Sequence, residues 1–157
     1  FNLFEVVDDI TVNYPSGTFS GVGSANMNLD SWRSLSEEQR QALLEATAVL
    51  SAEFSWGYEK GAVDNERTAE EQGIGLTQPS EAMVEKNREF IREDLKTIAS
   101  AYEERYGVEN ADQKIERFRE LLAEWRERID GVESSEELAD LYWEHVFSKV
   151  DVSQYGQ

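Results

Sequence analysis

The feature that most constrains the fold is a single helical pattern that runs without a break from residue 36 to residue 72. It opens with Ser36-Glu37-Glu38-Gln39, a capping box in which the Ser hydroxyl accepts from the amide of Gln39 while the Gln side chain reaches back to the Ser amide. No Pro follows before Gly73. Apolar residues recur largely three or four positions apart, at Leu43, Leu44, Ala46, Leu50, Phe54, Tyr58, Ala62 and Val63.

The length of this helix bears on the number of lobes. A continuous helix over residues 36–72 is roughly 55 Å long at about 1.5 Å per residue. A compact body of 157 residues has a radius of gyration of only about 15 Å. The helix would overhang such a body, so the sequence predicts a second lobe.

A short strand at residues 74–77 and a second helix are predicted next. Pro79-Ser80-Glu81 favours a helix start, and Gly107 has the usual position of a residue just beyond a helix C-terminus. The predicted apolar stripe of this helix consists of Met83, Val84, Phe90, Ile91, Leu95, Ile98, Tyr102 and Tyr106.

Two shorter helices complete the chain and bring the predicted helix content to about two-thirds, well above the usual third. Asn110-x-x-Gln113 can cap the first, which Gly131 stops, and Ser134-x-x-Glu137 can cap the second. The first carries an apolar seam with nearly heptad spacing, formed by Ile115, Phe118, Leu122, Trp125 and Ile129. The stripe of the second is Leu138, Leu141, Tyr142, His145, Val146 and Val150.

Residues 1–27 mix apolar and small residues in a way that is typical of extended structure. Tyr14-Pro15-Ser16-Gly17 interrupts this pattern as a turn, since Pro lacks a ladder donor and Gly permits positive φ. Residues 18–27 are then predicted to form a strand. The buried candidates before the turn are Phe1, Leu3, Phe4, Val6, Val7, Ile10 and Val12.

The order of segments carries a family resemblance. A short extended segment leads into Asn28-Leu29-Asp30-Ser31-Trp32-Arg33-Ser34-Leu35, then the long helical pattern and Gly73-Ile74-Gly75-Leu76, with Phe4-Glu5-Val6 upstream. This order resembles the C-terminal part of the solute-binding proteins of tripartite ATP-independent periplasmic (TRAP) transporters, in which a strand ending in Asn, followed by Trp or Tyr and Leu, precedes a helix that spans both lobes. The resemblance covers roughly residues 3–106.

The resemblance implies a helix-rich α/β fold, the C-terminal portion of a two-lobed periplasmic binding protein with a lobe-spanning helix. Residues 1–109 would supply the hinge strand, a strand, the long helix, the short strand and a helix, and residues 110–157 a helical C-terminal extension. Family members are about twice as long. Their first half, with the Arg that pairs with the substrate carboxylate, has no counterpart here, so we expect this chain to be a C-terminal piece.

The function implied by the resemblance is periplasmic capture of a small organic anion, a carboxylate, and its delivery to the membrane permease of a TRAP transporter. Hinge closure would accompany binding. In the family the turn after the hinge strand lies near the cleft, so Asn13, Tyr14 and Phe19 are the expected ligand-binding residues. Arg33 is interpreted as a solvated flank of the helix cap. The expected partners include the missing N-terminal half and, through the C-terminal helices, a second copy in a homodimer.

Composition excludes several classes of function. With 15 Lys+Arg against 33 Asp+Glu, the net charge is −18, which repels nucleic acid and anionic membrane surfaces. The absence of Cys excludes disulfides and Cys zinc sites, and no apolar run reaches the roughly 20 residues that span a bilayer. We predict no catalytic residue, metal or cofactor, because the lone His145 and the scattered carboxylates form no catalytic signature.

Two alternatives remain open. The chain could be a self-contained helical interaction module that presents the seam from Ile115 to Ile129 to a partner protein. It could also be an enzyme of an unfamiliar type. A packed core without an open cleft would favour the module, whereas a pocket that holds His145 beside converging carboxylates would favour the enzyme.

Overall fold

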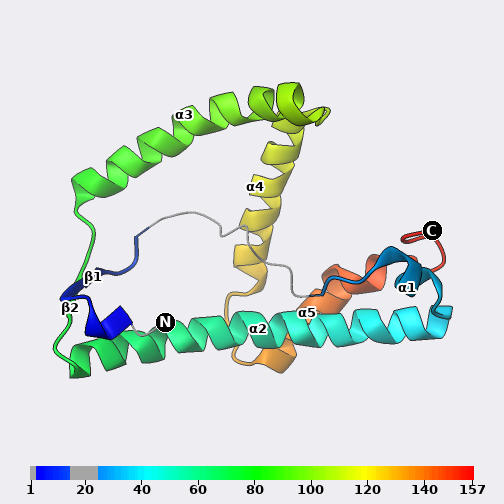
Figure 1. Cartoon of the computed structure of the whole chain (residues 1–157), viewed down its shortest axis with the longest axis horizontal. Helices are drawn as coiled ribbons and strands as arrows, with labels where there is room; N and C mark the ends of the chain where they lie inside the picture. Colours follow the sequence, from blue (N-terminus) through cyan, green and yellow to red (C-terminus); the bar gives the residue numbers. More distant parts are fainter. Residues whose placement is uncertain (1–2, 15–24) are drawn as a thin grey trace. The chain divides into compact units, whose positions relative to one another are not determined.

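The computed structural model describes residues 3–14 and 25–157, and within them the chain is mainly helical, as the sequence predicts (Figure 1). In chain order the elements are η1 (Leu3–Glu5), β1 (Asp9–Thr11), α1 (Leu29–Arg33), α2 (Glu37–Glu71), β2 (Gly75–Thr77), α3 (Glu81–Tyr106), α4 (Ala111–Arg128), α5 (Ser135–His145) and η2 (Phe147–Lys149).

The chain forms two compact units, and neither is continuous in sequence. Unit 1 contains residues 1–18 and 65–127, and unit 2 contains residues 19–64 and 128–157. Helix α2 contributes residues to both units, whereas α4 belongs to unit 1 except for its last residue, Arg128. The boundary between residues 109 and 110, which follows from the family resemblance, divides the chain at a different point and stays a prediction.

The long helix predicted from the sequence is confirmed as α2, 35 residues long. Its capping box is formed, because the amide of Gln39 donates to the Ser36 hydroxyl (3.2 Å) and the Ser36 amide donates to the Gln39 side chain (2.9 Å). At the other end Gly73 takes a left-handed φ of 78°, and the amide of Ile74 donates to the Ala69 carbonyl (2.9 Å). Gly tolerates that φ without steric cost, which explains why α2 ends there.

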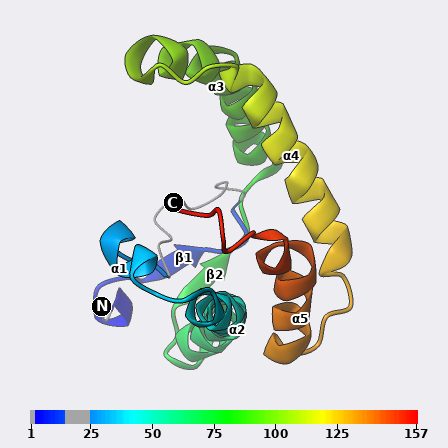
Figure 2. The same cartoon turned by 90° about the vertical axis from the view of Figure 1, so that its right-hand side faces the viewer.

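The face of α2 that packs differs from the expected one. Arg40, Leu44, Ala48 and Ala52, each four residues apart, are buried. The predicted stripe continues instead through Leu50, Phe54, Tyr58 and Val63, which are exposed. The small Ala side chains allow α5 to lie close beside α2, and Ala52 forms a core cluster with Leu138 and Ala139 of α5 (Figure 2).

The other helix boundaries follow local signals. The Ser80 hydroxyl accepts from the Met83 amide (3.2 Å) at the start of α3, and Gly107 ends that helix with φ 65°. The Ser134 hydroxyl accepts from the Glu137 amide (3.1 Å) at the start of α5. These three predictions are confirmed.

The predicted cap at Asn110 is wrong, although α4 does begin at the next residue. Asn110 has a left-handed φ of 54°, whereas an N-cap residue is normally extended. The amide of Ala111 is instead satisfied by the Glu103 carboxylate at 3.0 Å. A carboxylate from the preceding helix therefore takes the place of the expected cap.

The two strands form a parallel pair in which Asp9, Ile10 and Thr11 face Gly75, Leu76 and Thr77. The Thr77 hydroxyl donates to the Asp9 carboxylate at 2.9 Å. A side chain at Gly75 would meet that carboxylate, so the Asp9 side chain would have to move to admit a larger residue there. The predicted short strand at residues 74–77 is confirmed.

The N-terminal segment is less extended than predicted. Leu3–Glu5 is a 3-10 helix, and Leu3 and Val6 are exposed, so two of the buried candidates are wrong, while Val12 is buried. Phe1 and residues 15–24 of the predicted turn and strand lie outside the described residues. Residues 25–27 are not a strand and lead directly to the Asn28 cap of α1.

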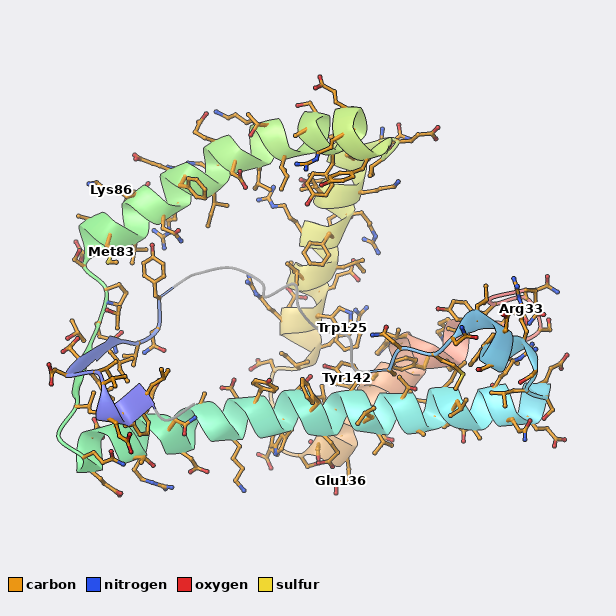
Figure 3. The ribbon with its side chains drawn as sticks, viewed as in Figure 1. Arg33, Met83, Lys86, Trp125, Glu136 and Tyr142 are labelled. Carbon is orange, nitrogen blue, oxygen red and sulfur yellow. The ribbon has the colours of Figure 1, made fainter. Side chains whose placement is uncertain are left out.

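Helices α3 and α4 keep much of their apolar surface uncovered. No residue of α3 is buried, and in α4 only Ala111 is. Phe90 of α3 is 67% exposed and Phe118 of the predicted α4 seam is 51% exposed, whereas Trp125 is half-buried (Figure 3).

Candidate functional site

Two of the three residues predicted to bind ligand lie just beyond β1. Asn13 has a left-handed φ of 54°, and its side-chain amide donates to the Gln78 side chain at 3.4 Å. Asn13 is exposed, Tyr14 is half-buried, and Phe19 lies outside the described residues. Because Gln78 directly follows β2, the structure brings together polar side chains from the carboxyl ends of both parallel strands.

In unit 2, the residues around Trp32 are held by several specific hydrogen bonds. The Asn28 side chain caps α1 by accepting from the amides of Asp30 (2.9 Å) and Ser31 (3.1 Å). This short helix buries Trp32, which remains only 8% exposed. The indole N–H donates to the Tyr155 carbonyl at 2.8 Å, and the two rings meet edge to face at 5.7 Å.

Arg40 holds the chain end against α1. Its guanidinium donates to the carbonyls of Trp32 (3.1 Å), Arg33 (3.0 Å) and Val152 (3.0 Å), and it lies 5.7 Å from the Trp32 ring centre. The side chain is only 7% exposed. Several carbonyl dipoles and the ring face thus replace the water that a buried guanidinium loses.

Arg33 corrects the prediction of a purely solvated flank. Its Nε donates to the Gly156 carbonyl at 2.8 Å, so although exposed it also ties the chain end to α1. Gly156 has φ 72°, and a Cβ there would come within 2.9 Å of the Trp32 ring. Gly is therefore needed for this close approach.

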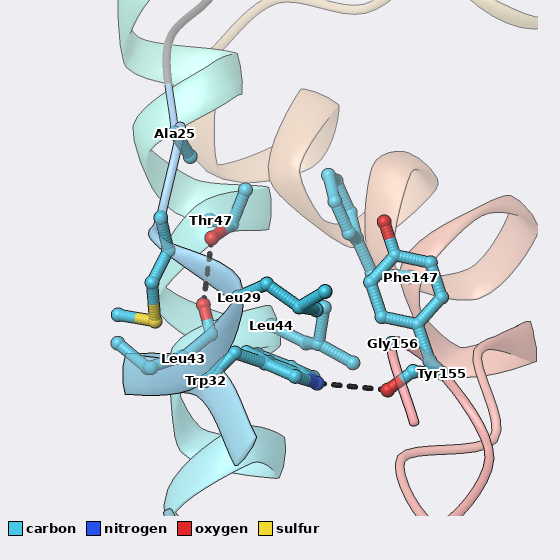
Figure 4. Close-up of a pocket in the computed structure, with 10 residues that line it drawn as sticks. Ala25, Leu29, Trp32, Leu43, Leu44, Thr47, Phe147, Tyr155 and Gly156 are labelled. Carbon is cyan, nitrogen blue, oxygen red and sulfur yellow. Dashed lines mark hydrogen bonds between the residues drawn. The ribbon is translucent and has the colours of Figure 1, made fainter. Parts of the chain in front are cut away.

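A cavity of about 480 Å³ opens beside Trp32 (Figure 4). The Thr47 hydroxyl donates to the Leu43 carbonyl at 2.7 Å and so is already satisfied as a donor. The lining is otherwise mostly apolar. It consists of Ala25, Met27, Leu29, Trp32, Leu43, Leu44, Thr47, Phe147, Tyr155 and Gly156, all of which belong to unit 2.

The turn that positions the chain end is centred on Asp151. Its carboxylate accepts from the Ser153 hydroxyl (2.6 Å) and the Ser153 amide (2.9 Å). These hydrogen bonds, led by the hydroxyl, lower the pKa of the Asp151 carboxyl below its ordinary value of 3.8. The carboxylate therefore stays ionised and keeps the turn in place at neutral pH.

Metal-ligand clusters and membrane-spanning helices were the next features sought within residues 3–14 and 25–157. No group of three or more His, Asp or Glu residues there is arranged to hold a metal ion, and no helix there is long and apolar enough to cross a membrane. A shallow cavity of about 300 Å³ is lined by Glu137, Asp140 and Glu144, among others, but His145 is not part of its lining.

The sequence patterns did not indicate the roles of Arg40 and the chain end. The position of Arg40, four residues before Leu44 on the buried face of α2, was the available signal. Comparison with protein-family models, curated proteins and solved structures found no match for this chain.

Proposed function

We propose that this chain is the C-terminal part of an extracytoplasmic solute-binding protein of the TRAP type. The whole protein would capture a small organic anion, a carboxylate, in the periplasm and deliver it to the membrane permease. The observation that carries the proposal is α2, because one 35-residue helix contributes to two compact units. It begins four residues after the Asn28-capped α1 that holds Trp32, in the order of the family pattern.

The small sheet supports the proposal. A parallel pair of three-residue strands is too small to be stable alone, and parallel strands normally belong to larger, covered sheets. Both outer edges of such a pair can accept further strands. In the proposed two-lobed fold, the missing first half of the protein supplies them.

The position of the predicted ligand residues also agrees with this function. Parallel α/β sheets bind ligands beyond the carboxyl ends of their strands. Asn13 and Tyr14 follow β1, and Gln78 follows β2. Phe19 remains a prediction of the same kind. Contacts of the ligand with both lobes would favour a closed state in proportion to its differential affinity for that state.

The test uses the full-length protein and this 157-residue chain in thermal-shift measurements against a panel of organic acids. We expect one carboxylate to stabilise the full-length protein and to have little effect on the chain alone, because the resemblance places the binding Arg upstream. Stabilisation of neither, or of both equally, would contradict the proposal.

A matched pair of variants makes the test residue-specific. Asn13 and Asn110 both have φ 54° and both are exposed, so replacing either by Asp changes the same chemistry in the same backbone conformation. Asn13→Asp places a negative charge at the proposed site and should weaken carboxylate binding in the full-length protein. Asn110→Asp should leave binding unchanged.

A second candidate, the helical interaction module, is favoured by the uncovered apolar side chains of α3 and α4, such as Phe90 and Phe118. Residues 81–128 contain 13 acidic and ten basic side chains, whereas the rest of the chain contains 20 and five. The net charge of this stretch is −3, against −15 for the rest of the chain, so it repels an acidic partner less than the remainder does. Sedimentation of the wild type and of Trp125→Ala, which truncates the predicted seam, would reveal self-association through the C-terminal helices.

A further inference from the structure

The cavity beside Trp32 has walls that are fixed by specific bonds. The indole of Trp32 is held by the Tyr155 carbonyl, and Arg40 links Trp32 to the C-terminal segment by donating to the carbonyls of Trp32 and Val152. Gly156 lets the chain end approach the indole more closely than any other residue would. Hydrogen bonds between segments more than 100 residues apart thus join Trp32 to the chain end on one side of the cavity, while Met27, Leu29 and Tyr155 of the lining are also exposed.

The chemistry of the lining selects an uncharged ligand. Apart from Tyr155, no lining residue has a titratable side chain, and neither Lys nor Arg is present to pair with an anion. The Tyr155 hydroxyl makes no hydrogen bond within the described residues, so it can donate to or accept from a ligand.

We propose that this cavity binds a small uncharged molecule with an apolar ring and one hydroxyl group, the ring lying against Trp32 and the hydroxyl bonding Tyr155. The volume of about 480 Å³ lies within the range of small-molecule sites and exceeds the about 150 Å³ that accommodates benzene in an apolar cavity. The site is independent of the proposed carboxylate function, because it involves none of Asn13, Tyr14 and Phe19.

The test is an NMR titration of the 157-residue chain with p-cresol, benzoate and toluene. The indole N–H signal of Trp32, assigned through Trp32→Phe, is the readout, since Trp32 is the tryptophan in the lining. We expect saturable shifts with p-cresol and a dissociation constant of about 1 mM or tighter, which a ligand of eight non-hydrogen atoms reaches at modest efficiency. Benzoate, of similar size but charged, should bind at least about tenfold more weakly because no cation meets it.

Two matched substitutions show whether p-cresol binds in the cavity or on another apolar surface. Thr47→Phe fills the cavity and should abolish the p-cresol shift. Thr97→Phe is the control, because Thr97 also lies in a helix and its hydroxyl also donates to a backbone carbonyl of the preceding turn, but it lies outside the lining. It should bind as the wild type does.

A milder variant keeps the proposal testable if Thr47→Phe does not fold. Tyr155→Phe retains the ring and removes only the hydroxyl, so p-cresol binding should weaken about two- to tenfold while toluene binding is unchanged. Equal binding of p-cresol and benzoate, or unaltered p-cresol binding in both Thr47→Phe and Tyr155→Phe, would overturn the proposal.

Discussion

Unit 2 and unit 1 are stabilised in different ways. In unit 2, Trp32, Arg33 and Arg40 bond to carbonyls 112 to 123 residues away in the sequence. In unit 1, α3 has no buried residue, and the ion pairs of Glu85 with Arg88 and Arg92 and of Glu93 with Lys96 join residues three or seven apart within the same helix. Such exposed pairs contribute little to stability. Unit 2 therefore depends on tertiary contacts, and α3 depends mainly on helix propensity and caps.

This difference shows which part of the chain needs a partner. A helix without tertiary packing is marginal in water, even when it is well capped. Helix α3 has 26 residues with exposed Phe90, Tyr102 and Tyr106 along it, whereas α5, with only 11 residues, packs against Ala52. We therefore expect a covering surface for α3, supplied by another part of the protein or by a partner chain.

The largest difference in unfolding free energy is expected between Ala substitutions at two tryptophans, Trp32 and Trp125. Trp32→Ala removes a buried ring, its hydrogen bond to Tyr155 and the contact with Arg40, and should lower the free energy of unfolding by about 3 to 5 kcal/mol. Trp125→Ala should cost clearly less, because Trp125 is only half-buried. Denaturant unfolding followed by circular dichroism measures both. Equal losses would mean that unit 1 is packed as firmly as unit 2.

Interruption of α2 is expected to have the next largest effect. Ala46 is exposed in the middle of the helix, so Ala46→Pro acts through the backbone alone and should cost about 3 kcal/mol or more. Ser36→Pro precedes the helix and should lose mainly the capping bonds. If both variants unfold at the same denaturant concentration, α2 is not one cooperative helix.

Local signals predicted the helix ends well, because a cap or a C-terminal Gly involves only a few neighbouring residues. The Ser36 box, the Ser80 and Ser134 caps and Gly107 all lie where the sequence places them. The cap at Asn110 failed because the distant Glu103 carboxylate took its role. Local patterns thus predict where helices begin and end, except where another element intervenes.

The candidate site was less predictable. The hydrogen bonds from Arg40 and Arg33 to the chain end cannot be predicted from a local sequence pattern, because any residue can supply a backbone carbonyl. The buried face of α2 was also missed, because Ala48 and Ala52 are weakly hydrophobic whereas Phe54 and Tyr58 dominate the pattern. Close helix packing selects small side chains, which pattern analysis undervalues.

The caps at Ser80 and Ser134 can be compared directly, because replacing either Ser by Ala should cost about 1 kcal/mol of helix stability. The hydroxyls of Ser80 and Ser134 each accept from the amide three residues later, at 3.2 and 3.1 Å. Ser134→Ala should lower the unfolding free energy of unit 2, because α5 is part of its core. Ser80→Ala should instead raise hydrogen exchange in the first turn of α3, without a change in unit 2. Exchange measured by NMR distinguishes the two, and a shared response would show that α3 and unit 2 unfold together.

The smallest expected effect concerns two carboxylates in acid. A hydrogen bond from Arg92 lowers the pKa of Glu85 from 4.5, and the Ser153 hydroxyl lowers that of Asp151 from 3.8. A carboxyl group whose folded pKa is lowered contributes stability above its unfolded pKa, and this contribution is lost as the pH falls through the folded pKa. Both groups are exposed, so each contribution is small and screened by salt.

Their consequences should nevertheless differ between the units. Protonation of Asp151, below pH 3.8, weakens the turn that presents the Tyr155 carbonyl to Trp32, whereas protonation of Glu85, below pH 4.5, affects only pairs within α3. The indole N–H signal of Trp32 in an NMR pH titration should therefore shift below pH 3.8. That shift should persist in Glu85→Gln and disappear in Asp151→Asn, in which the amide oxygen can still accept from Ser153 but the group no longer titrates. Its survival in Asp151→Asn would show that another acid controls the chain end and takes part in the long-range contacts of unit 2.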